Sequence, residues 1–70
     1  MSNLQQIRKA AGLSQSAVAD MAGVSLRMIQ FYEQGVKDIN KAQGITLYKI
    51  AGALNVSIED ILEIEPEKRV

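Results

Sequence analysis

Residues 15–34, QSAVADMAGVSLRMIQFYEQ, decide the fold of this chain. Apolar residues recur at helical spacing before and after Gly23, and this glycine interrupts the pattern. Glycine readily takes the left-handed backbone conformation that ends a helix, and Ser25 is a good N-cap for a new helix. The stretch therefore predicts two short helices joined by a tight turn, with the small Ala19 where they cross. The apolar positions are Val18, Ala19, Ala22, Val24, Ile29 and Tyr32.

Capping residues elsewhere predict five helices in total, and so an all-α fold. The first helix begins at a capping box formed by Asn3 and Gln6, and Leu4, Ile7 and Ala11 line its buried face. The other expected boundaries follow: Gly12 ends the first helix; Ser14 caps the second, Gln15 to about Ala22; Ser25 caps the third, Leu26 to about Gln34, which Gly35 ends; the fourth runs from about Thr46, or somewhat earlier, to Leu54, where Asn55 ends it; Ser57 caps the fifth.

The last two helices also show which residues they bury. The segment between the third and fourth helices is polar, although Ile39 is expected to turn inward. Carboxylates in the first turn of the fifth helix favour the positive end of its dipole. The expected core residues are Leu47, Ile50, Ala51 and Leu54 of the fourth helix and Ile58, Ile61 and Leu62 of the fifth.

Seventy residues make one domain, with a core from about residue 4 to residue 63 and a tail at 64–70. A chain of this length buries only roughly 60% of its unfolded surface, so association with a partner would add stability. The chain contains neither cysteine nor histidine, which excludes disulfides, thiolate metal sites and the commonest general base. No apolar run approaches the roughly 20 residues of a membrane span, and Arg8 and Lys9 interrupt any signal peptide. We therefore expect a cytoplasmic protein.

The net charge of zero conceals an uneven distribution. Residues 1–49 contain six basic and three acidic side chains, whereas residues 50–70 contain two basic and five acidic ones. This asymmetry suggests a basic working surface in the first part of the chain, although ordinary solvated charge explains it equally well.

The central stretch resembles the helix-turn-helix of the phage lambda and 434 repressor and Cro family, also called the XRE family. The flanking stretches RKAAGLSQ (8–15), YEQG (32–35) and TLYKIAGALNVSIEDIL (46–62) agree with this family as well. The resemblance covers residues 4–63 and implies a five-helix DNA-binding domain that acts as a transcriptional regulator, in particular a repressor. The matching motif positions are Gln15 first, Ala19 fifth, Gly23 ninth, Val24 tenth, Ile29 fifteenth and Tyr32 eighteenth.

In this family the third helix enters the major groove of DNA. A helical wheel puts Ile29 and Tyr32 on the buried side of this helix and leaves the opposite side free. An arginine matches guanine O6 and N7, a glutamine matches adenine N6 and N7, and a phenylalanine can contact a thymine methyl group. Surface solvation is the alternative for the polar residues, and burial at an interface or against Met28 and Val36 is the alternative for Phe31. The implied base-contacting residues are Ser25, Leu26, Arg27, Gln30 and Phe31.

Contacts to phosphate are expected on both sides of the third helix. The family's glutamine at the position of Gln15 contacts the DNA backbone, at a helix start where free N–H groups attract anions. The alternative is a polar helix cap and ordinary surface charge. Arg8 and Glu33 match a charged pair that joins the first helix to the third in this family. The expected phosphate-contacting residues are Ser14, Gln15, Ser16, Gln34, Lys37, Asn40 and Lys41.

Leu26, Met28 and Phe31 make the third helix more apolar than that of the phage proteins. This departure keeps a second reading open, in which the chain is a protein-interaction or antitoxin-like module that binds through the apolar third helix. Fold alone does not decide between the two.

An enzyme is not expected, because no nucleophile with an adjacent base and no phosphate-binding glycine loop is found. Glu59, Asp60 and Glu63 lie at helical spacing, but the helix dipole explains them better than a metal site does. We expect no cofactor, metal, membrane or small-molecule substrate. We do expect a homodimer on a palindromic operator, because one domain reads only a few base pairs. The fifth helix and the tail with Ile64 and Val70 are the expected contact.

Overall fold

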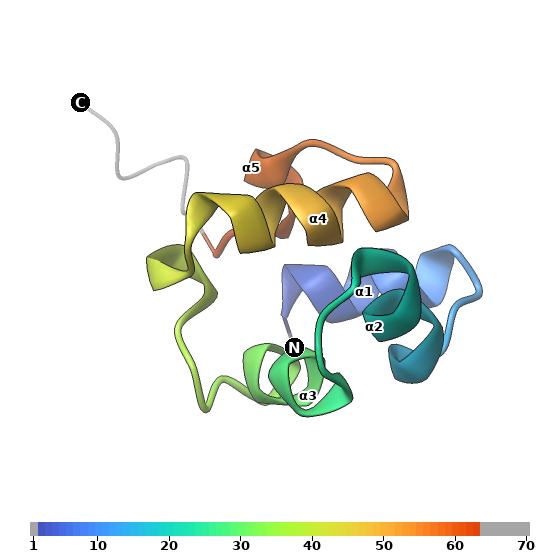
Figure 1. Cartoon of the computed structure of the whole chain (residues 1–70), viewed down its shortest axis with the longest axis horizontal. Helices are drawn as coiled ribbons and strands as arrows, with labels where there is room; N and C mark the ends of the chain where they lie inside the picture. Colours follow the sequence, from blue (N-terminus) through green and yellow to red (C-terminus); the bar gives the residue numbers. More distant parts are fainter. Residues whose placement is uncertain (1, 64–70) are drawn as a thin grey trace.

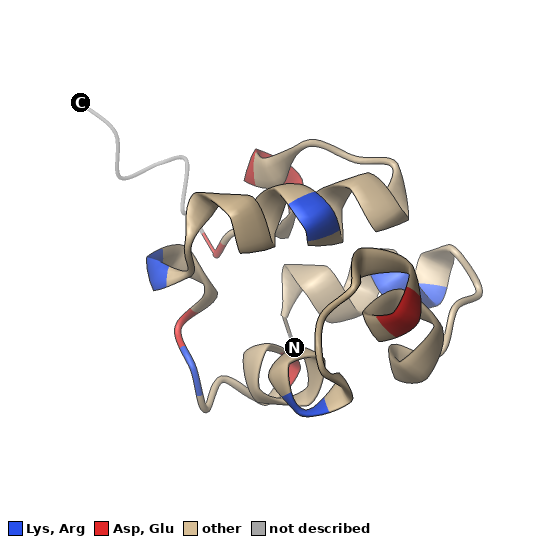
Figure 2. Cartoon of the chain, viewed as in Figure 1, with Lys and Arg blue, Asp and Glu red and all other residues tan. Residues whose placement is uncertain are grey.

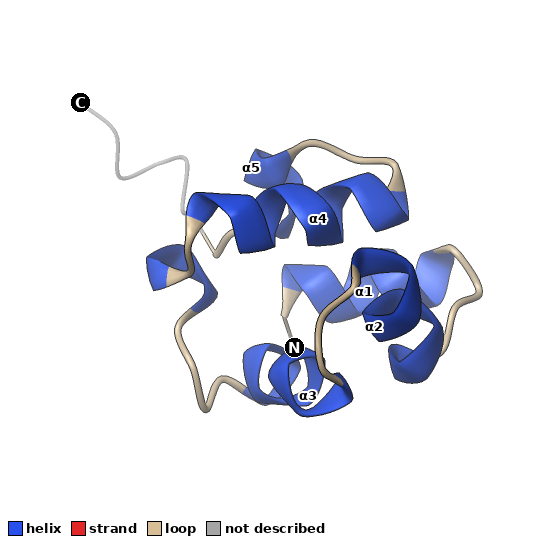
Figure 3. Ribbon diagram, in the orientation of Figure 1, coloured by secondary structure: helices blue, strands red, loops and turns tan. Residues whose placement is uncertain are grey.

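The computed structural model describes residues 2–63, and in this range it contains helices and loops but no strand (Figure 3). The predicted all-α fold with five α-helices is confirmed, and a short 3₁₀ helix, η1, is added between the third and fourth. The elements are α1 (Asn3–Ala10), α2 (Gln15–Ala22), α3 (Leu26–Gln34), η1 (Ile39–Lys41), α4 (Gly44–Leu54) and α5 (Ile58–Ile61).

The helices are arranged so that α3 lies at one side of the molecule. Helix α2 packs against both α3 and α4, α1 packs against α3 and α5, and α4 packs against α5. In Figure 1, α4 and α5 lie along the top, α3 lies at the bottom, and α1 and α2 lie between them. One face of α3 is therefore covered by α1 and α2, whereas Leu26, Arg27 and Gln34 of the same helix are exposed.

The core takes one fully buried large side chain from each α-helix. These side chains are Leu4, Val18, Ile29, Ile50 and Ile61. Burial of each side chain contributes about 1.5–3 kcal/mol. All five belong to one hydrophobic cluster, so the five helices share one core. The buried stripe predicted for α4 and the inward turn of Ile39 are both confirmed. In α5, Ile61 is fully buried, and Ile58 and Leu62 pack against the core while partly exposed.

The turn between α2 and α3 has the predicted geometry. Gly23 is left-handed, with φ 71°, and the N–H of Val24 donates to the carbonyl of Ala19 at 3.0 Å. The hydroxyl of Ser25 then accepts the N–H of Met28 at 3.1 Å and starts α3. A Cβ built on Gly23 meets no atom within 4 Å. The backbone angle, rather than lack of space, is therefore the reason for glycine at this position.

The predicted start of α1 is wrong. Ser2, rather than Asn3, is the N-cap, and its hydroxyl accepts the N–H of Gln5 at 3.0 Å. The side chain of Asn3 is used elsewhere, because its Nδ2 donates to the carbonyl of Leu62 at 2.8 Å. Ala11, predicted to be buried, is exposed after the helix end, and Arg8 occupies the buried position instead.

A set of hydrogen bonds joins the start of α1, η1 and the end of α5. The N–H of Asn3 donates to the Glu63 carboxylate at 2.7 Å. The carboxamide of Asn40 pairs with the Glu63 backbone through both of its ends: Oδ1 accepts the N–H at 2.8 Å and Nδ2 donates to the carbonyl at 3.1 Å. These contacts fix residue 63, beyond which Ile64 and Val70, predicted to form a dimer contact, lie outside the described residues.

Candidate nucleic-acid interface

The side of α3 that faces away from the core contains the predicted base-contacting residues. Ile29, Tyr32 and Glu33 are buried against the other helices. Arg27 and Gln34 are exposed, as are Ser25 and Leu26 at the start of the helix. Gln30 is half-buried. The structure therefore brings the predicted residues together along one free helix face, which the helical spacing of the sequence was sufficient to indicate.

Phe31 is less exposed than its position on the helical wheel implies. It is half-buried and lines a hollow of about 150 Å³, together with Met28, Arg27, Ser25 and Lys37. The loop after α3 is held close to this hollow, because the carbonyl of Phe31 accepts the N–H of Lys37 at 3.3 Å. The apolar side chains of Met28 and Phe31 therefore lie beside two cationic side chains, those of Arg27 and Lys37.

A buried network of hydrogen-bonded charged side chains holds the core-facing side of α3. Arg8 Nε donates to Glu33 Oε2 at 2.6 Å, and Arg8 Nη2 donates to Glu33 Oε1 at 3.1 Å. Arg8 Nη1 also donates to the carbonyl of Leu13 at 2.8 Å. The Arg8–Glu33 pair expected from the family resemblance is thus present, and it joins α1 to α3. A two-point arginine–carboxylate contact fixes orientation as well as distance.

Gln15, at the first position of α2, belongs to the same network. Its Nε2 donates to Glu33 Oε1 at 2.9 Å, a contact that sequence spacing did not reveal. A carboxamide nitrogen has two hydrogens, so one remains for an outside acceptor. Glu33 therefore orients the side chain that the family resemblance assigns to phosphate.

The start of α2 provides further donors beside Gln15. The hydroxyl of Ser14 accepts the N–H of Ala17 at 3.0 Å, and Ser16 is exposed. The N–H groups of a helix's first turn have no partner within the helix, and the dipole favours an anion there. Because α2 packs against α3 and Gln15 bonds Glu33, these donors lie beside the third helix.

Two lysines lie on the other side of α3. Lys37 and Lys41 line an open groove of about 490 Å³ between α3, η1 and the start of α4. Figure 2 shows a basic and an acidic segment on α3 and again in the loop after it, a basic segment on η1 and another on α4, and acidic segments alone on α5. Among the exposed charged side chains of residues 2–49, five are basic and two are acidic, whereas those of residues 50–63 are all acidic.

Asn40 has an intramolecular role that sequence reasoning did not predict. Its carboxamide is used at both ends by the backbone of Glu63, and its own N–H donates to Asp38 Oδ1 at 2.9 Å. Its partner is 23 residues away, so no local pattern could have indicated the contact. These bonds favour a structural role over the expected contact with phosphate.

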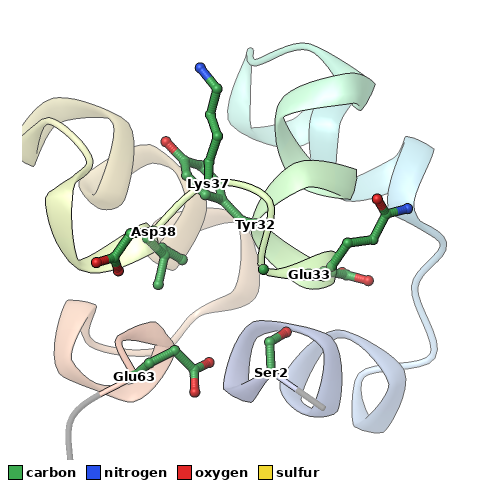
Figure 4. Close-up of a pocket in the computed structure, with 9 residues that line it drawn as sticks. Ser2, Tyr32, Glu33, Lys37, Asp38 and Glu63 are labelled. Carbon is green, nitrogen blue, oxygen red and sulfur yellow. The ribbon is translucent and has the colours of Figure 1, made fainter.

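A larger hollow, of about 500 Å³, has the wrong charge for DNA. Its lining includes the acidic residues Glu33, Asp38 and Glu63. Ser2 and Glu63 lie on one side of it and Tyr32 and Asp38 on the other (Figure 4). Lys37 reaches away from the hollow in this view. A phosphate would be repelled by these acidic residues, so this hollow is a poor candidate for binding DNA.

Asp60 of α5 and Glu63 after it accept intramolecular hydrogen bonds. Asp60 completes a capping box with Ser57, whose N–H donates to Asp60 Oδ2 at 3.1 Å. Glu63 accepts from Asn3. Within residues 2–63 no group of three potential metal-ligating side chains is present, and no helix in that range is long and apolar enough to cross a membrane.

Comparison with known proteins agrees with this geometry. No curated protein sequence matches the chain significantly. The crystal structure of the restriction-modification controller protein C.AhdI from Aeromonas hydrophila is similar, with a TM-score of 0.76, 25% sequence identity and coverage of 86% of each chain. A helix-turn-helix family model matches residues 4–61, which include all five α-helices except the first residue of α1. This chain therefore belongs to the XRE-type helix-turn-helix family and is a DNA-binding transcription regulator.

Proposed function

We propose that this chain is a repressor that binds double-stranded DNA sequence-specifically, with α3 in the major groove. The observation that carries the proposal is the free face of α3, where Arg27 is exposed and Gln30 half-exposed while Ile29 and Tyr32 anchor the opposite side. A helix held rigidly by its buried side can present donors to base edges at low cost in conformational entropy.

The base-reading roles follow from side-chain chemistry. Arg27 offers two parallel donors to guanine O6 and N7, and Gln30 offers one donor and one acceptor to adenine. Each such pair is worth about 1–3 kcal/mol of discrimination against the wrong base. Ser25 and Leu26 lie at the start of α3, where the family's docking geometry brings side chains to the edge of the groove.

The phosphate contacts lie on both flanks of α3. On the α2 side, Gln15 offers its second N–H, and the hydroxyls of Ser14 and Ser16 are close by in the chain. On the opposite side, Gln34, Lys37 and Lys41 extend from the end of α3 and from the loop and η1 that follow it. These contacts would set register and orientation rather than sequence preference.

Recognition of an operator by two copies follows from the size of the reading surface. One α3 helix reaches only a few base pairs, so a two-fold dimer with half-sites about 34 Å apart would double the sequence that is read. Occupation of such a palindrome within a promoter would exclude polymerase, which is the physical basis of repression.

Selection of bound duplexes from a random pool tests the proposal. We expect one palindromic sequence to be enriched, and Arg27→Ala to relax the choice at one position of each half-site. Gln15→Ala should weaken binding to all duplexes similarly. Lys49→Ala is the matched control, because Lys49 is an exposed cation on α4, away from α3. If Arg27→Ala and Gln15→Ala both bind the selected duplex as the parent does, the proposed interface is wrong.

A second candidate function is favoured by apolar exposure near α3. Leu26 is 39% exposed and Val36 is 63% exposed, and such residues also suit a protein partner. A salt series separates the two functions, because DNA binding weakens steeply as counterions are released. Affinity that hardly changes between 50 and 200 mM salt would favour a protein partner.

A further inference from the structure

The hollow between Met28 and Phe31 is an apolar feature of the proposed DNA-reading face, beside the exposed Leu26 at the start of α3. Both side chains are half-buried, so they form its floor, and Ser25, Arg27 and Lys37 form its rim. Its volume of about 150 Å³ is small, and two of the residues that line it, Arg27 and Phe31, lie opposite Ile29 by helical spacing. Polar recognition of bases alone leaves this apolar floor without a partner.

The major groove contains few groups that match such a floor. Base edges there present nitrogen and oxygen donors and acceptors, and the C5-methyl group of thymine is the apolar exception. 5-Methylcytosine carries the same methyl group on the same ring carbon, whereas cytosine and uracil carry hydrogen. A hollow that binds the methyl group would therefore treat thymine and 5-methylcytosine alike and would disfavour their unmethylated counterparts.

In this arrangement, Arg27 would select the base that follows the methylated pyrimidine. Arg27 and Phe31 are four residues apart and share one face of α3. When a guanidinium bonds guanine O6 and N7, its flat apolar face lies over the pyrimidine on the 5′ side of that guanine. The methyl group of that pyrimidine then meets the guanidinium plane on one side and the Phe31 ring on the other.

Lys37 completes the arrangement from the rim. Its N–H bonds the carbonyl of Phe31, which keeps its side chain beside the same hollow. The Lys37 ammonium can neutralise the phosphate of the same base step, an interaction that the Phe31 ring cannot make.

We propose that the Met28–Phe31 hollow reads the C5-methyl group of a pyrimidine directly 5′ of the guanine bound by Arg27. This inference rests on the proposed function, and it adds a specificity: each half-site contains a TG step, which a 5-methylcytosine–guanine step can replace. Phe31 and Met28 are then specificity-determining residues that make no hydrogen bond to a base.

The test uses the full chain and the duplex selected from the random pool. At every pyrimidine that precedes a guanine, thymine is compared with uracil and 5-methylcytosine with cytosine, so that base pairing stays the same within each comparison. Burial of one methyl group predicts a roughly fourfold tighter Kd for each methylated half-site, and about 15-fold when both half-sites carry it. Because the contact is apolar, this ratio should stay constant between 50 and 200 mM salt.

Two variants locate the effect on the protein. Phe31→Ala and Met28→Ala should each reduce the methyl preference to less than twofold, whereas Lys49→Ala, an exposed change on α4 outside the proposed interface, should leave it intact. If a variant does not fold, as judged by its thermal melt, the parent comparisons still decide the matter.

Suppose that the parent binds its selected duplex tightly and that Arg27→Ala weakens this binding. The inference is then overturned if no methyl removal next to a guanine changes Kd by more than 1.5-fold, a threshold well below the predicted fourfold effect. It is also overturned if the methyl preference survives in both Phe31→Ala and Met28→Ala. The absence of any selected duplex would instead refute the proposed function itself.

Discussion

Removal of the Glu33 carboxylate should destabilise the domain more than any other single charge change. The side chains of Glu33 and Arg8 are 1% and 10% exposed, so both charges are out of water. Glu33→Ala deletes the two bonds from Arg8, at 2.6 and 3.1 Å, and the bond from Gln15 at 2.9 Å. Arg8 is then a buried cation whose one remaining bond goes to the carbonyl of Leu13.

The expected cost is about 3–5 kcal/mol, which is the usual result of breaking a buried pair by removing one partner. A domain of this length has a total stability of about 3.5–10 kcal/mol, so the variant should be close to unfolded. The shift in melting temperature is expected to be about 12–40 °C, from a few degrees per kcal/mol for small domains.

Removal of both charges should cost far less. Arg8→Met with Glu33→Leu leaves no charged group at this buried position, and such replacements are often neutral or stabilising. Urea unfolding followed by circular dichroism measures each variant, and the double-mutant cycle isolates the coupling. Asp20→Ala, an exposed carboxylate on α2, is the matched control and should change stability by no more than about 0.5 kcal/mol. A loss below about 1 kcal/mol for Glu33→Ala would refute the reasoning, as would a double variant no more stable than the weaker single one.

Three further outcomes follow from the structure. Gly23→Ala should cost about 1–2 kcal/mol because φ is 71° there, whereas Gly52→Ala, inside α4 with no atom within 4 Å of a new Cβ, should stabilise by about 0.5–1 kcal/mol; urea unfolding compares the two. Asn40→Ala should remove both bonds to the Glu63 backbone and so speed hydrogen exchange of the Glu63 amide, with little change at core amides; unchanged exchange would contradict the contact. Lys37→Ala should reduce the slope of log Kd against log salt by about 0.9, and Lys49→Ala should leave it unchanged.

Local signals in the sequence were enough to place most helix boundaries. Ser14 and Ser25 cap through residues three positions later, and Gly12, Gly23 and Gly35 are left-handed at the helix ends. Such contacts depend on neighbours in the chain, so a short pattern carries them. The prediction for Asn3 was wrong because Ser2 is an equally good cap and because Asn3 has partners near residue 63.

Two of the contacts that sequence reasoning missed join distant residues. Gln15 meets Glu33 across 18 positions, and Asn40 meets Glu63 across 23. Both involve carboxamides, which look like ordinary surface residues until the tertiary fold supplies a partner. The half-burial of Phe31 involves nearer residues, because it lines a hollow with Met28 and Lys37, and its carbonyl accepts the N–H of Lys37, six positions later.

The network of Arg8, Gln15 and Glu33 contributes to stability and, in the proposed interface, to DNA binding. Variants can separate the two contributions. In the variant with Arg8→Met and Glu33→Leu, the fold should survive while Gln15 loses the carboxylate that orients it. Loss of one well-oriented hydrogen bond to phosphate predicts Kd values about 2- to 12-fold weaker, measured by fluorescence anisotropy. The loss should be equal for the selected operator and for mixed-sequence duplexes, because phosphate contacts carry no sequence information. Adding Gln15→Ala to this variant should then change little. A doubly substituted protein that binds DNA as tightly as the parent would show that Glu33 supports the fold alone, and that Gln15 needs no orientation to reach the duplex.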